Sequence, residues 1–326
     1  MSSRELSFAK ATREAMIEEM KRDESVFLYG EDIVKQGGIF GQFAGMQQLF
    51  PERVLDTPIS ETALVGAGVG AALAGAKPVI DLHFADFIGI VMDEVLNQMA
   101  KAHYMFGGQA TMSLVLRAPD GVMPHGAAQH TQSLEAWFTN IPGIKVVTPS
   151  DPATGKGLLK EAIRDPNPVL YFENKRLFSV TGPVPDGEVV TEIGKAAVVR
   201  QGTDVTLVSY SMMLDEARKA AEAVWEQAGL SVEVIDLRSI VPLDMATIYR
   251  SVKKTGRLVI AHEALRIGGV GSEIAARVAE HAFEWLQAPI SRVGARPCPM
   301  PFSPGLEDYV RVGEQDIIDA LLNIAG

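Results

Sequence analysis

The sequence predicts an α/β protein built from two domains of unequal size. Short apolar runs alternate with longer amphipathic ones through almost all of the 326 residues, a pattern typical of strands that alternate with helices. Such alternation implies a parallel sheet that is covered by helices on both faces. The pattern breaks near residues 180–192 and then restarts, so we expect a second, smaller domain after the break.

The first half of the chain contains segments of both kinds. Residues 7–23 carry an amphipathic pattern, and Ser7 is a plausible N-cap for that helix. A helix of small side chains is expected to begin near Glu61, and helical patterns also cover residues 86–104 and 152–165. The expected strands cover residues 25–30, 53–57, 77–84, 112–119, 144–150 and 168–174.

A cluster of proline, glycine and acidic residues marks the break in the pattern. Such a cluster without periodicity is typical of a linker. We therefore expect a first domain over residues 1–180, a linker over 181–192 and a second domain over 193–326. In the second domain we expect strands over residues 204–211, 230–240, 257–264 and 288–294, and helices over 213–229, 244–256, 272–286 and 315–326.

Composition limits the kinds of partner that this chain can have. The 30 basic and 41 acidic residues give a net charge of -11, which argues against nucleic acid or an anionic membrane as a partner and leaves a basic protein open. The single cysteine, Cys298, excludes an internal disulfide framework and a cysteine-rich metal site, and we expect a buried or half-buried thiol. The N-terminus has no apolar signal core and no apolar run approaches 18 residues, so we expect a cytoplasmic protein.

Three glycines in "VGAGVGAALAG", Gly66, Gly68 and Gly70, come close to a dinucleotide-binding fingerprint. That fingerprint needs a strand immediately before it, whereas these glycines follow the start of a helix near Glu61. At helical spacing, Gly66, Gly70 and Ala74 would form a flat stripe that lets another backbone approach closely, so we favour a contact between subunits. An NAD-binding oxidoreductase remains the alternative that uses these glycines as a phosphate loop.

Polar residues stand out against apolar surroundings in three places. Glu31 and Asp32 end a predicted strand, and Glu61 heads the run of small side chains. His125 and His130 lie in a loop rich in glycine, alanine and proline. Ligands of parallel sheets bind at the carboxyl ends of strands, and a buried carboxylate without a partner is costly. The pattern therefore indicates an α/β enzyme with a site near Glu31, Glu61 and His130.

Several motifs in order along nearly the whole chain carry a resemblance to a known family. They are "YGED", "DTPISETALVGAGVGAALAGAKPV", "FADF", "QHTQS", "PGIKVVTPSDPATGKGLL", "AIRDPNPVLYFEN", "VEVIDLRSIVPLD", "KTGRLVIAHEA" and "APISRV". The chain resembles the beta subunit of the thiamine diphosphate-dependent dehydrogenase component of 2-oxo acid dehydrogenase complexes. The resemblance implies a pyrimidine-binding α/β domain followed by a smaller transketolase C-terminal-like α/β domain, and an oxidoreductase activity.

The resemblance also assigns roles to single positions. The acid at Glu61 would bond to a ring nitrogen of the cofactor's aminopyrimidine and favour the imino tautomer, whose imine removes the thiazolium proton to give the ylid that attacks a carbonyl. Small apolar neighbours are expected to keep this carboxyl dry and able to share its proton. Phe87 would pack on the aminopyrimidine, and Glu31 would lie near the cofactor and help to link paired active sites. His130 would lie near the reacting carbon and the incoming lipoyl group.

Other positions match the family less directly. In "QHTQS", Thr131 stands where serine is commoner in the family. Some relatives hold a structural potassium ion, partly through backbone carbonyls, and the resemblance carries this site to Leu114, Ala162, Ile163, Asp165 and Asn167.

The sequence lacks the Gly-Asp-Gly motif with a later asparagine that holds a magnesium diphosphate in thiamine enzymes. The resemblance implies that a separate alpha subunit carries this motif and holds the diphosphate and Mg²⁺. This chain would then be active only in an alpha2-beta2 heterotetramer, with the glycine stripe at a contact between subunits. The C-terminal domain is expected to dock on a dihydrolipoyl acyltransferase core through that protein's small basic domain. A non-catalytic assembly subunit stays open as an alternative, and a transketolase-like homodimer is disfavoured.

The substrate is expected from three further stretches. "DFIG" at 86–89, "YMFGG" at 104–108 and "PFSPGLED" at 301–308 resemble the acetoin dehydrogenase branch of the family. Acetoin cleavage would give acetaldehyde and an acetyl group for lipoamide. A pyruvate or branched-chain 2-oxo acid dehydrogenase beta subunit is the alternative within the family.

Overall fold

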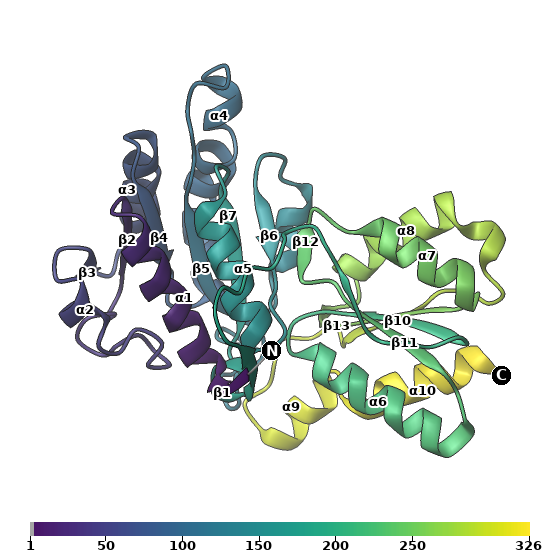
Figure 1. Cartoon of the computed structure of the whole chain (residues 1–326). Coiled ribbons are helices and arrows are strands. Elements are labelled where there is room, and N and C mark those ends of the chain that lie inside the picture. The colour runs from purple at the N-terminus through teal and green to yellow at the C-terminus, as the bar shows by residue number, and fades with distance from the viewer. Residues whose placement is uncertain (1–2) are drawn as a thin grey trace. The chain divides into compact units, whose positions relative to one another are not determined.

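The computed structural model describes residues 3–326, whose contacts divide the chain into two compact units (Figure 1). The first unit contains the residues up to Asp120 together with Trp137–Ile193, and the second contains Gly121–Ala136 together with Gly194–Gly326. The segment Gly121–Ala136 therefore packs with the second unit, although it interrupts the first in sequence. The expected range of 1–180 for the first domain did not anticipate this exchange.

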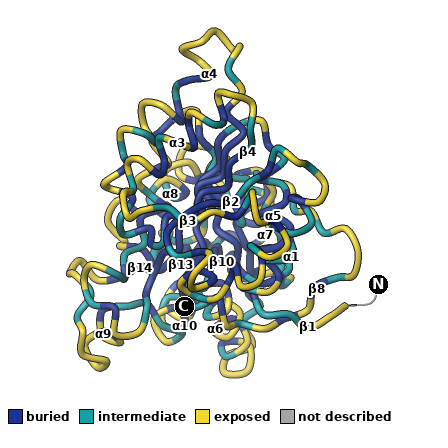
Figure 2. Tube along the Cα trace, turned by 90° about the vertical axis from the view of Figure 1, so that its left-hand side faces the viewer, coloured by how far each residue is buried: buried dark blue, intermediate teal, exposed yellow. Residues whose placement is uncertain are grey.

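The first unit is built around a sheet of parallel strands, as the apolar runs predict. The strands follow the order β6-β7-β5-β4-β2-β3, and each neighbouring pair is parallel. Figure 2 shows β2 and β4 as a largely buried part of the chain, which is why they appear in sequence as continuous apolar runs. The bounds are Val26–Gly30 for β2, Val54–Asp56 for β3, Lys77–Asp81 for β4, Val115–Asp120 for β5, Lys145–Val147 for β6 and Val169–Asn174 for β7.

Helices cover both faces of this sheet. Leu28 of β2 lies in a core with residues of the first and fifth helices, whereas the hydroxyl of Tyr29 donates to the carbonyl of Leu64 in the third helix at 2.7 Å. Successive strand residues point to opposite faces, so the third helix covers the face opposite to the other two. The bounds are Phe8–Arg22 for α1, Glu61–Leu73 for α3 and Pro152–Arg164 for α5.

The helix caps follow from the local sequence. The Ser7 side chain accepts a hydrogen bond from the backbone N–H of Lys10 at 3.3 Å, which confirms the predicted N-cap of α1. At α5, the Asp151 carboxylate accepts from the N–H of Thr154 at 2.8 Å, while the Thr154 hydroxyl accepts from the N–H of Asp151. These reciprocal bonds form a capping box and fix the start of the helix.

The glycines of α3 have different surroundings. A Cβ added to Gly68 would lie 2.4 Å from Cδ1 of Ile80, so Gly68 is the residue that lets the helix approach the sheet. A Cβ at Gly70 would meet nothing within 4 Å in the described chain, and Gly66 is equally open apart from Glu94 at 3.8 Å. The dinucleotide-loop alternative is wrong, because these glycines lie inside a helix rather than in a turn before one.

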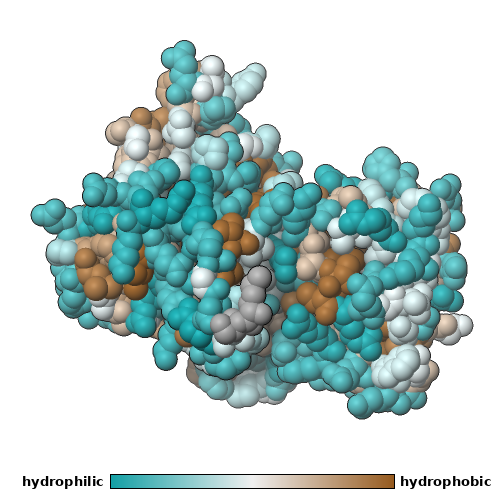
Figure 3. Space-filling view, in the orientation of Figure 1, coloured by the Kyte–Doolittle hydropathy of each residue, from teal (hydrophilic) through white to brown (hydrophobic). Residues whose placement is uncertain are grey.

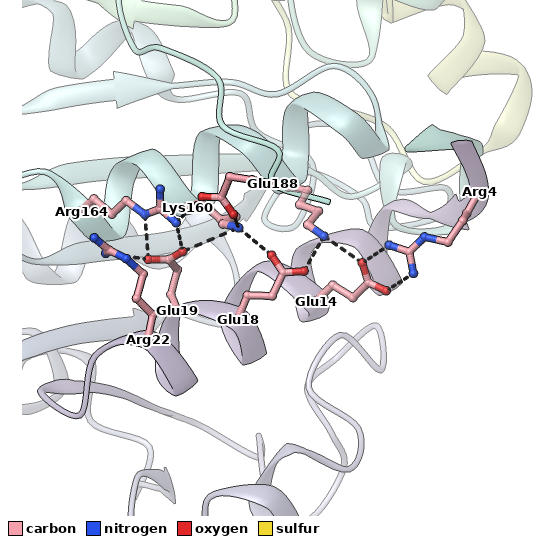
Figure 4. Close-up of polar contacts among 9 residues, drawn as sticks. Arg4, Glu14, Glu18, Glu19, Arg22, Lys160, Arg164 and Glu188 are labelled. Carbon is pink, nitrogen blue, oxygen red and sulfur yellow. Dashed lines mark hydrogen bonds and ion pairs between the residues drawn. The ribbon is translucent and has the colours of Figure 1, made fainter. Parts of the chain in front are cut away.

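Charged side chains join α1 to α5. The ammonium group of Lys156 pairs with Glu14 and Glu18 at 3.0 and 2.6 Å, and that of Lys160 pairs with Glu18 at 2.6 Å. Both lysine side chains are only 1% exposed, and the surface over α1 is mostly hydrophilic (Figure 3). Figure 4 shows these ion pairs together with their neighbours. The labelled residues are Arg4, Glu14, Glu18, Glu19, Arg22, Lys160, Arg164 and Glu188.

The stretch from Asp86 to Tyr104 is not the single helix that its pattern predicts. It consists of a 3-10 turn at Ala85–Val91 (η1), a π-helical turn at Glu94–Met99 (η2) and a short α-helix at Ala102–Met105 (α4). Gly89 lies inside the first of these segments and lowers its propensity for a regular α-helix. Irregular helical turns of this kind are frequent at functional sites.

The segment expected to be a linker begins with a strand. β8 (Thr181–Pro185) pairs antiparallel with β1 (Ser3–Ser7), with Ser7 opposite Thr181. Proline is tolerated in such an edge strand because one side of the strand needs no N–H donor. Since the pairing joins residues far apart in sequence, no local pattern reveals it.

The second unit contains a five-stranded sheet within the described chain, in the order β14-β13-β10-β11-β9. The first four strands are parallel, and β9 runs antiparallel to β11. The antiparallel edge strand β9 was not expected from the sequence. The bounds are Ala197–Arg200 for β9, Val205–Ser209 for β10, Val232–Asp236 for β11, Leu258–Leu265 for β13 and Ser291–Ala295 for β14, while β12 spans Ser239–Val241.

Helices also cover both faces of the second sheet. Leu207 of β10 lies in a core with residues from the helices α6 and α10, whereas the hydroxyl of its neighbour Thr206 bonds to Ser251 and Thr255 of α7. The two sides are visible in Figure 1, with α6 and α10 on one and α7 and α8 on the other. The bounds are Met213–Ala228 for α6, Met245–Thr255 for α7, Val270–His281 for α8, Pro304–Val310 for α9 and Glu314–Ala325 for α10.

Short elements complete the described chain. No helix within residues 3–326 is long and apolar enough to cross a membrane. Cys298 is exposed, so the expectation of a buried or half-buried thiol was wrong. It lies between two prolines in an irregular segment. The remaining elements are α2 (Met46–Leu49), η3 (Glu135–Asn140), η4 (Leu177–Ser179) and η5 (Phe283–Trp285).

Candidate active site

Glu31 marks one end of the candidate site in the first unit. It follows β2 directly and is only 5% exposed. Burial raises the pKa of its carboxyl and the charge of Glu61 raises it further, while a hydrogen bond from the backbone of Ser60 acts against them. The Oε1 atom has no hydrogen-bond partner in the described chain. A buried acid with an unused acceptor is a candidate for a ligand contact.

Glu61 is the first residue of α3. The structure brings Glu61 close enough to Glu31 for their charges to interact. The side chain is half-exposed in this chain rather than dry as the sequence predicts. A dry environment for Glu61 would therefore need another molecule to cover it.

His83 joins this group and was missed in the sequence. It follows β4, whose Asp81 lies opposite Gly30 in the sheet, so His83 and Glu31 leave neighbouring strands at the same edge. Its backbone φ of 67° lies in the left-handed region, which is rare for a residue with a side chain. The strand expected over residues 77–84 included His83, whereas β4 ends at Asp81, so the sequence treated this histidine as a strand residue and gave no signal for it.

The ring of His83 lies among acidic groups. Burial lowers its pKa, while the charge of Asp32, a hydrogen bond to the backbone of Glu31 and the charge of Glu61 act in the opposite direction. Its Nδ1 atom is buried and lacks a hydrogen-bond partner among residues 3–326. The strand ends of the first unit therefore hold an unused donor or acceptor beside the unused oxygen of Glu31.

Phe87 lies in η1, which follows the end of β4 in the sequence. Its ring is half-exposed and packs edge-on against Phe84 at a centroid distance of 5.9 Å. The segment is fixed by a fully buried ion pair, in which the Lys175 ammonium lies 2.6 Å from the Asp86 carboxylate. Phe87 is therefore held against Phe84 and is half-exposed rather than enclosed in a core.

A second buried ion pair lies deeper in the sheet. Arg117 donates two hydrogen bonds to Glu173, at 2.9 and 2.7 Å, and both side chains are fully buried. Asp81 occupies the neighbouring position on β4, where burial raises the pKa of its carboxyl to about 7 and the Arg117 charge acts against this. This polar layer beneath Glu31 and His83 was not predicted, because its members look like strand residues in sequence.

His130 belongs to the second unit, in the segment Gly121–Ala136. The N–H of Gly121 donates to the carbonyl of Gln132 at 2.8 Å and closes the loop that carries His130. His125 lies in the same loop with a φ of 59°. Glu31 and Glu61 are thus brought together within the first unit, whereas His130 is placed by the second.

The positions expected to hold potassium gather around the C-terminus of α5. Asp165 caps that helix; its carboxylate pairs with Lys145 and accepts from the backbone and side-chain amides of Asn167, each at 2.9 Å. The Ser113 hydroxyl donates to the Asp165 carbonyl at 2.7 Å, and the Leu114 carbonyl accepts an N–H bond at 2.9 Å. Within residues 3–326 no three His, Cys, Asp or Glu side chains form a metal-binding group. The last turn of α5 also contains Ala162 and Ile163.

Two models of known domain families match this chain. The model of the transketolase pyrimidine-binding domain matches residues 4–180, and that of the transketolase C-terminal domain matches residues 194–317. A solved structure titled "Split gene transketolase, inactive beta4 tetramer" has the same fold, with a TM-score of 0.81 and 23% identity over 98% of both chains.

Curated relatives are similar over almost the whole chain. The "Acetoin:2,6-dichlorophenolindophenol oxidoreductase subunit beta" of Cupriavidus necator is 45% identical over 94% of this chain and 93% of that protein. The "2-oxoisovalerate dehydrogenase subunit beta" of Bacillus subtilis is 42% identical over 98% of both. The "Pyruvate dehydrogenase E1 component subunit beta" of Rhizobium meliloti is 43% identical over 97% of this chain and 69% of that protein. The chain therefore belongs to the family of transketolase-like beta subunits of acetoin and 2-oxo acid dehydrogenases.

Proposed function

We propose that this chain is the beta subunit of a thiamine diphosphate-dependent acetoin dehydrogenase that is active only with an alpha subunit. The observation that carries the proposal is the group at the strand ends of the first unit. There the carboxylate of Glu61 stands at a helix N-terminus close to Glu31 and His83. Oε1 of Glu31 and Nδ1 of His83 have no hydrogen-bond partner within residues 3–326. Unused buried polar atoms of this kind fit a polar heteroaromatic ring.

Each residue would have a separate task toward the aminopyrimidine. Glu61 would hold a proton in a hydrogen bond to a ring nitrogen, and the face of Phe87 would pack on the ring. Glu31 accepts the hydrogen bond from Ser60 and so fixes the turn from which Glu61 emerges. When bound, the cofactor supplies a nucleophilic carbon for addition to a carbonyl. His130 would act near the reacting carbon, where the acetyl group passes to a lipoyl arm.

The surface around Glu61 supports a covering subunit. Ile59 and Ile90 are 77% and 56% exposed, and the hydroxyl of Thr62 donates to the Ile90 carbonyl at 3.3 Å, so this apolar rim borders the start of α3. The open glycine positions Gly66 and Gly70 continue along the same helix. Exposed apolar surface beside a flat stripe favours contact with another chain.

We assign the missing functions to partners. The alpha subunit would supply the groups that hold the diphosphate and Mg²⁺, in an alpha2-beta2 heterotetramer, and the second unit would dock on a dihydrolipoyl acyltransferase core. A potassium ion would be held by carbonyl groups near Asp165, where it would share the site with the Lys145 ammonium. We propose a cytoplasmic location for the complex.

Acetoin is proposed as the substrate because the relatives from Cupriavidus necator and Bacillus subtilis that are named for it are 45% and 42% identical. Relatives named for 2-oxoisovalerate and pyruvate are 42% and 43% identical, so a 2-oxo acid is the competing substrate. The two reactions differ in the fragment that leaves, which is acetaldehyde from acetoin and carbon dioxide from a 2-oxo acid.

The test is reduction of an artificial acceptor by this chain assembled with its alpha subunit, thiamine diphosphate and Mg²⁺. Acetoin, pyruvate and 2-oxoisovalerate are compared in parallel. We expect turnover with acetoin, and a loss of at least about a hundredfold in Glu61→Gln, which cannot share a proton with the ring. Glu52→Gln, a change at an exposed acid, is the control for the loss of one charge.

The outcomes separate the proposals. Turnover confined to a 2-oxo acid would overturn acetoin as the substrate while keeping the role of Glu61. Full activity of an assembled Glu61→Gln tetramer would instead favour a non-catalytic subunit. Absence of turnover with every substrate from a correctly assembled tetramer would contradict the catalytic proposal itself.

A further inference from the structure

The loop that carries His130 is held by acidic residues of the second unit. The backbone N–H of Val122 donates to Oε2 of Glu263 at 3.1 Å, and the N–H of His125 donates to Oε2 of Glu307 at 3.1 Å. Each glutamate is only 8% exposed. Both acceptors are buried and belong to other segments of the second unit, so these two contacts tie the loop backbone to the body of that unit.

A buried tyrosine holds the other end of the segment. The hydroxyl of Tyr210 donates to Oε1 of Glu135 at 2.6 Å, and the two residues are 3% and 2% exposed. Burial raises the pKa of Glu135, the bond from Tyr210 acts against this, and the charge of Glu263 adds to it. His130 therefore lies between two anchors, one at Val122 and one at Glu135.

Packing beneath the loop is incomplete. A cavity of about 390 Å³ lies between the loop and the body of the second unit. Since apolar contacts normally fix a buried segment, a segment over a cavity depends more strongly on its hydrogen bonds. The cavity is lined on the loop side by Ala128, Thr131, Gln132, Ser133 and Leu134, and on the opposite side by Glu263, Ala264, Leu265, Cys298, Met300 and Val310.

We propose that Glu263 and the Tyr210–Glu135 pair are positioning residues, which hold the His130 loop in the geometry needed for acetyl transfer to the lipoyl arm. The inference rests on the proposed role of His130. It goes beyond that role because it assigns the placement of this histidine to buried groups outside the site. The anchors affect the transfer step selectively, since formation of the reactive carbon depends on Glu61 in the first unit.

The single cysteine offers a direct reporter of the loop. Cys298 is exposed and also lines the cavity beneath the loop, so a loop that moves away leaves its thiol more accessible. The rate at which a thiol reagent labels this chain, followed by the mass of the beta chain in the assembled tetramer, therefore measures the position of the loop without using activity.

The test compares Glu263→Ala, Glu263→Gln and Tyr210→Phe with the parent, each assembled with the alpha subunit. Tyr249→Phe is the control, because the hydroxyl of this tyrosine bonds only at 3.4 Å on the surface of α7. We expect Glu263→Ala and Tyr210→Phe to slow acetylation of a free lipoyl domain by at least about tenfold, since small misplacements of a reacting group are costly. Artificial-acceptor reduction should stay within about twofold of the parent, as expected when only one step loses its geometry.

Labelling of Cys298 should become faster in both variants, and Glu263→Gln, which keeps an acceptor for Val122, should fall between Glu263→Ala and the parent. If Glu263→Ala does not assemble, Glu263→Gln and Tyr210→Phe carry the same test with almost unchanged side-chain volume.

The variant His130→Ala distinguishes failure of the positioning role from failure of the proposed role of His130. If it slows acetylation while the anchor variants neither slow it nor expose Cys298, the positioning role is wrong and the role of His130 stands. If His130→Ala leaves acetylation unchanged, the proposed role of His130 fails, and the positioning proposal fails with it even where labelling shows that the loop has moved.

Discussion

The most strongly perturbed histidine of the described second unit is a structural residue. His262 on β13 is fully buried; its Nδ1 bonds to the carbonyl of Ala264 at 3.1 Å, and its Nε2 has no partner in the described chain. A Cβ at Gly269 or Gly271 would lie 2.9 Å from Nε2, so both glycines at the start of α8 are needed to make room for the ring. Burial lowers the pKa of His262 to about 4.

This pKa predicts how stability depends on pH. The ordinary value for histidine is about 6.5, so between pH 6.5 and 4 the unfolded chain binds a proton that the folded chain excludes. The stability due to neutral His262 is therefore complete above pH 6.5 and is lost as the pH falls toward 4, by up to about 3 kcal/mol. The measurement is the difference in free energy of unfolding between the parent and His262→Asn at each pH.

We expect that difference to shrink as the pH falls from 7.5 to 4.5. The comparison must be made against the parent at every pH, because Asp81 also titrates with folding. Burial raises the pKa of Asp81 to about 7, so its contribution to the free energy of unfolding falls as the pH rises, opposite to that of His262. A constant difference across this range would show that His262 does not titrate with folding.

At the scale of elements, α3 uses its glycines for two purposes. Gly68 faces the sheet, where added atoms would collide with Ile80 and with the hydroxyl of Tyr29 at 2.5 Å. Gly70 faces away from the sheet and meets nothing within 4 Å in the described residues. Glycine inside a helix costs about 1 kcal/mol relative to alanine, so an open glycine at this position needs a reason outside the chain.

The two positions predict opposite effects of the same substitution. Gly68→Ala should destabilise this chain by about 1–3 kcal/mol, because the packed neighbours must move. Gly70→Ala should stabilise the isolated chain by up to about 1 kcal/mol and weaken its assembly with the alpha subunit. Thermal unfolding of the isolated chain and gel filtration of the mixture measure the two effects. Unchanged assembly of Gly70→Ala would argue against a subunit contact at the stripe.

At the scale of the whole molecule, the proposed site would bind one end of the cofactor, and the sequence has no Gly-Asp-Gly motif for its diphosphate. We therefore predict no turnover from the isolated chain with thiamine diphosphate and Mg²⁺, and activity on addition of the alpha subunit together with formation of a heterotetramer. Calorimetry and the acceptor assay before and after mixing provide the measurement. Turnover by the chain alone would revive the transketolase-like homodimer.

The sequence was sufficient for features that depend on local pattern. The core strands and the long helices were predictable because parallel strands buried on both faces leave continuous apolar runs. The N-cap at Ser7 was predictable because it depends on residues within one turn. The helical pattern of residues 86–104 led to the wrong prediction of a single helix, because 3-10, π and α turns satisfy this pattern equally.

For the candidate site, the sequence by itself determined Glu31 and Glu61 as polar residues at strand and helix ends, and its motifs pointed to the family. Only the tertiary structure decided that His83 joins them, that Asp81 lies beneath them, and that the His130 loop packs with the second unit. The physical reason is that these arrangements depend on register between strands and on contacts between distant segments, which a one-dimensional pattern does not contain.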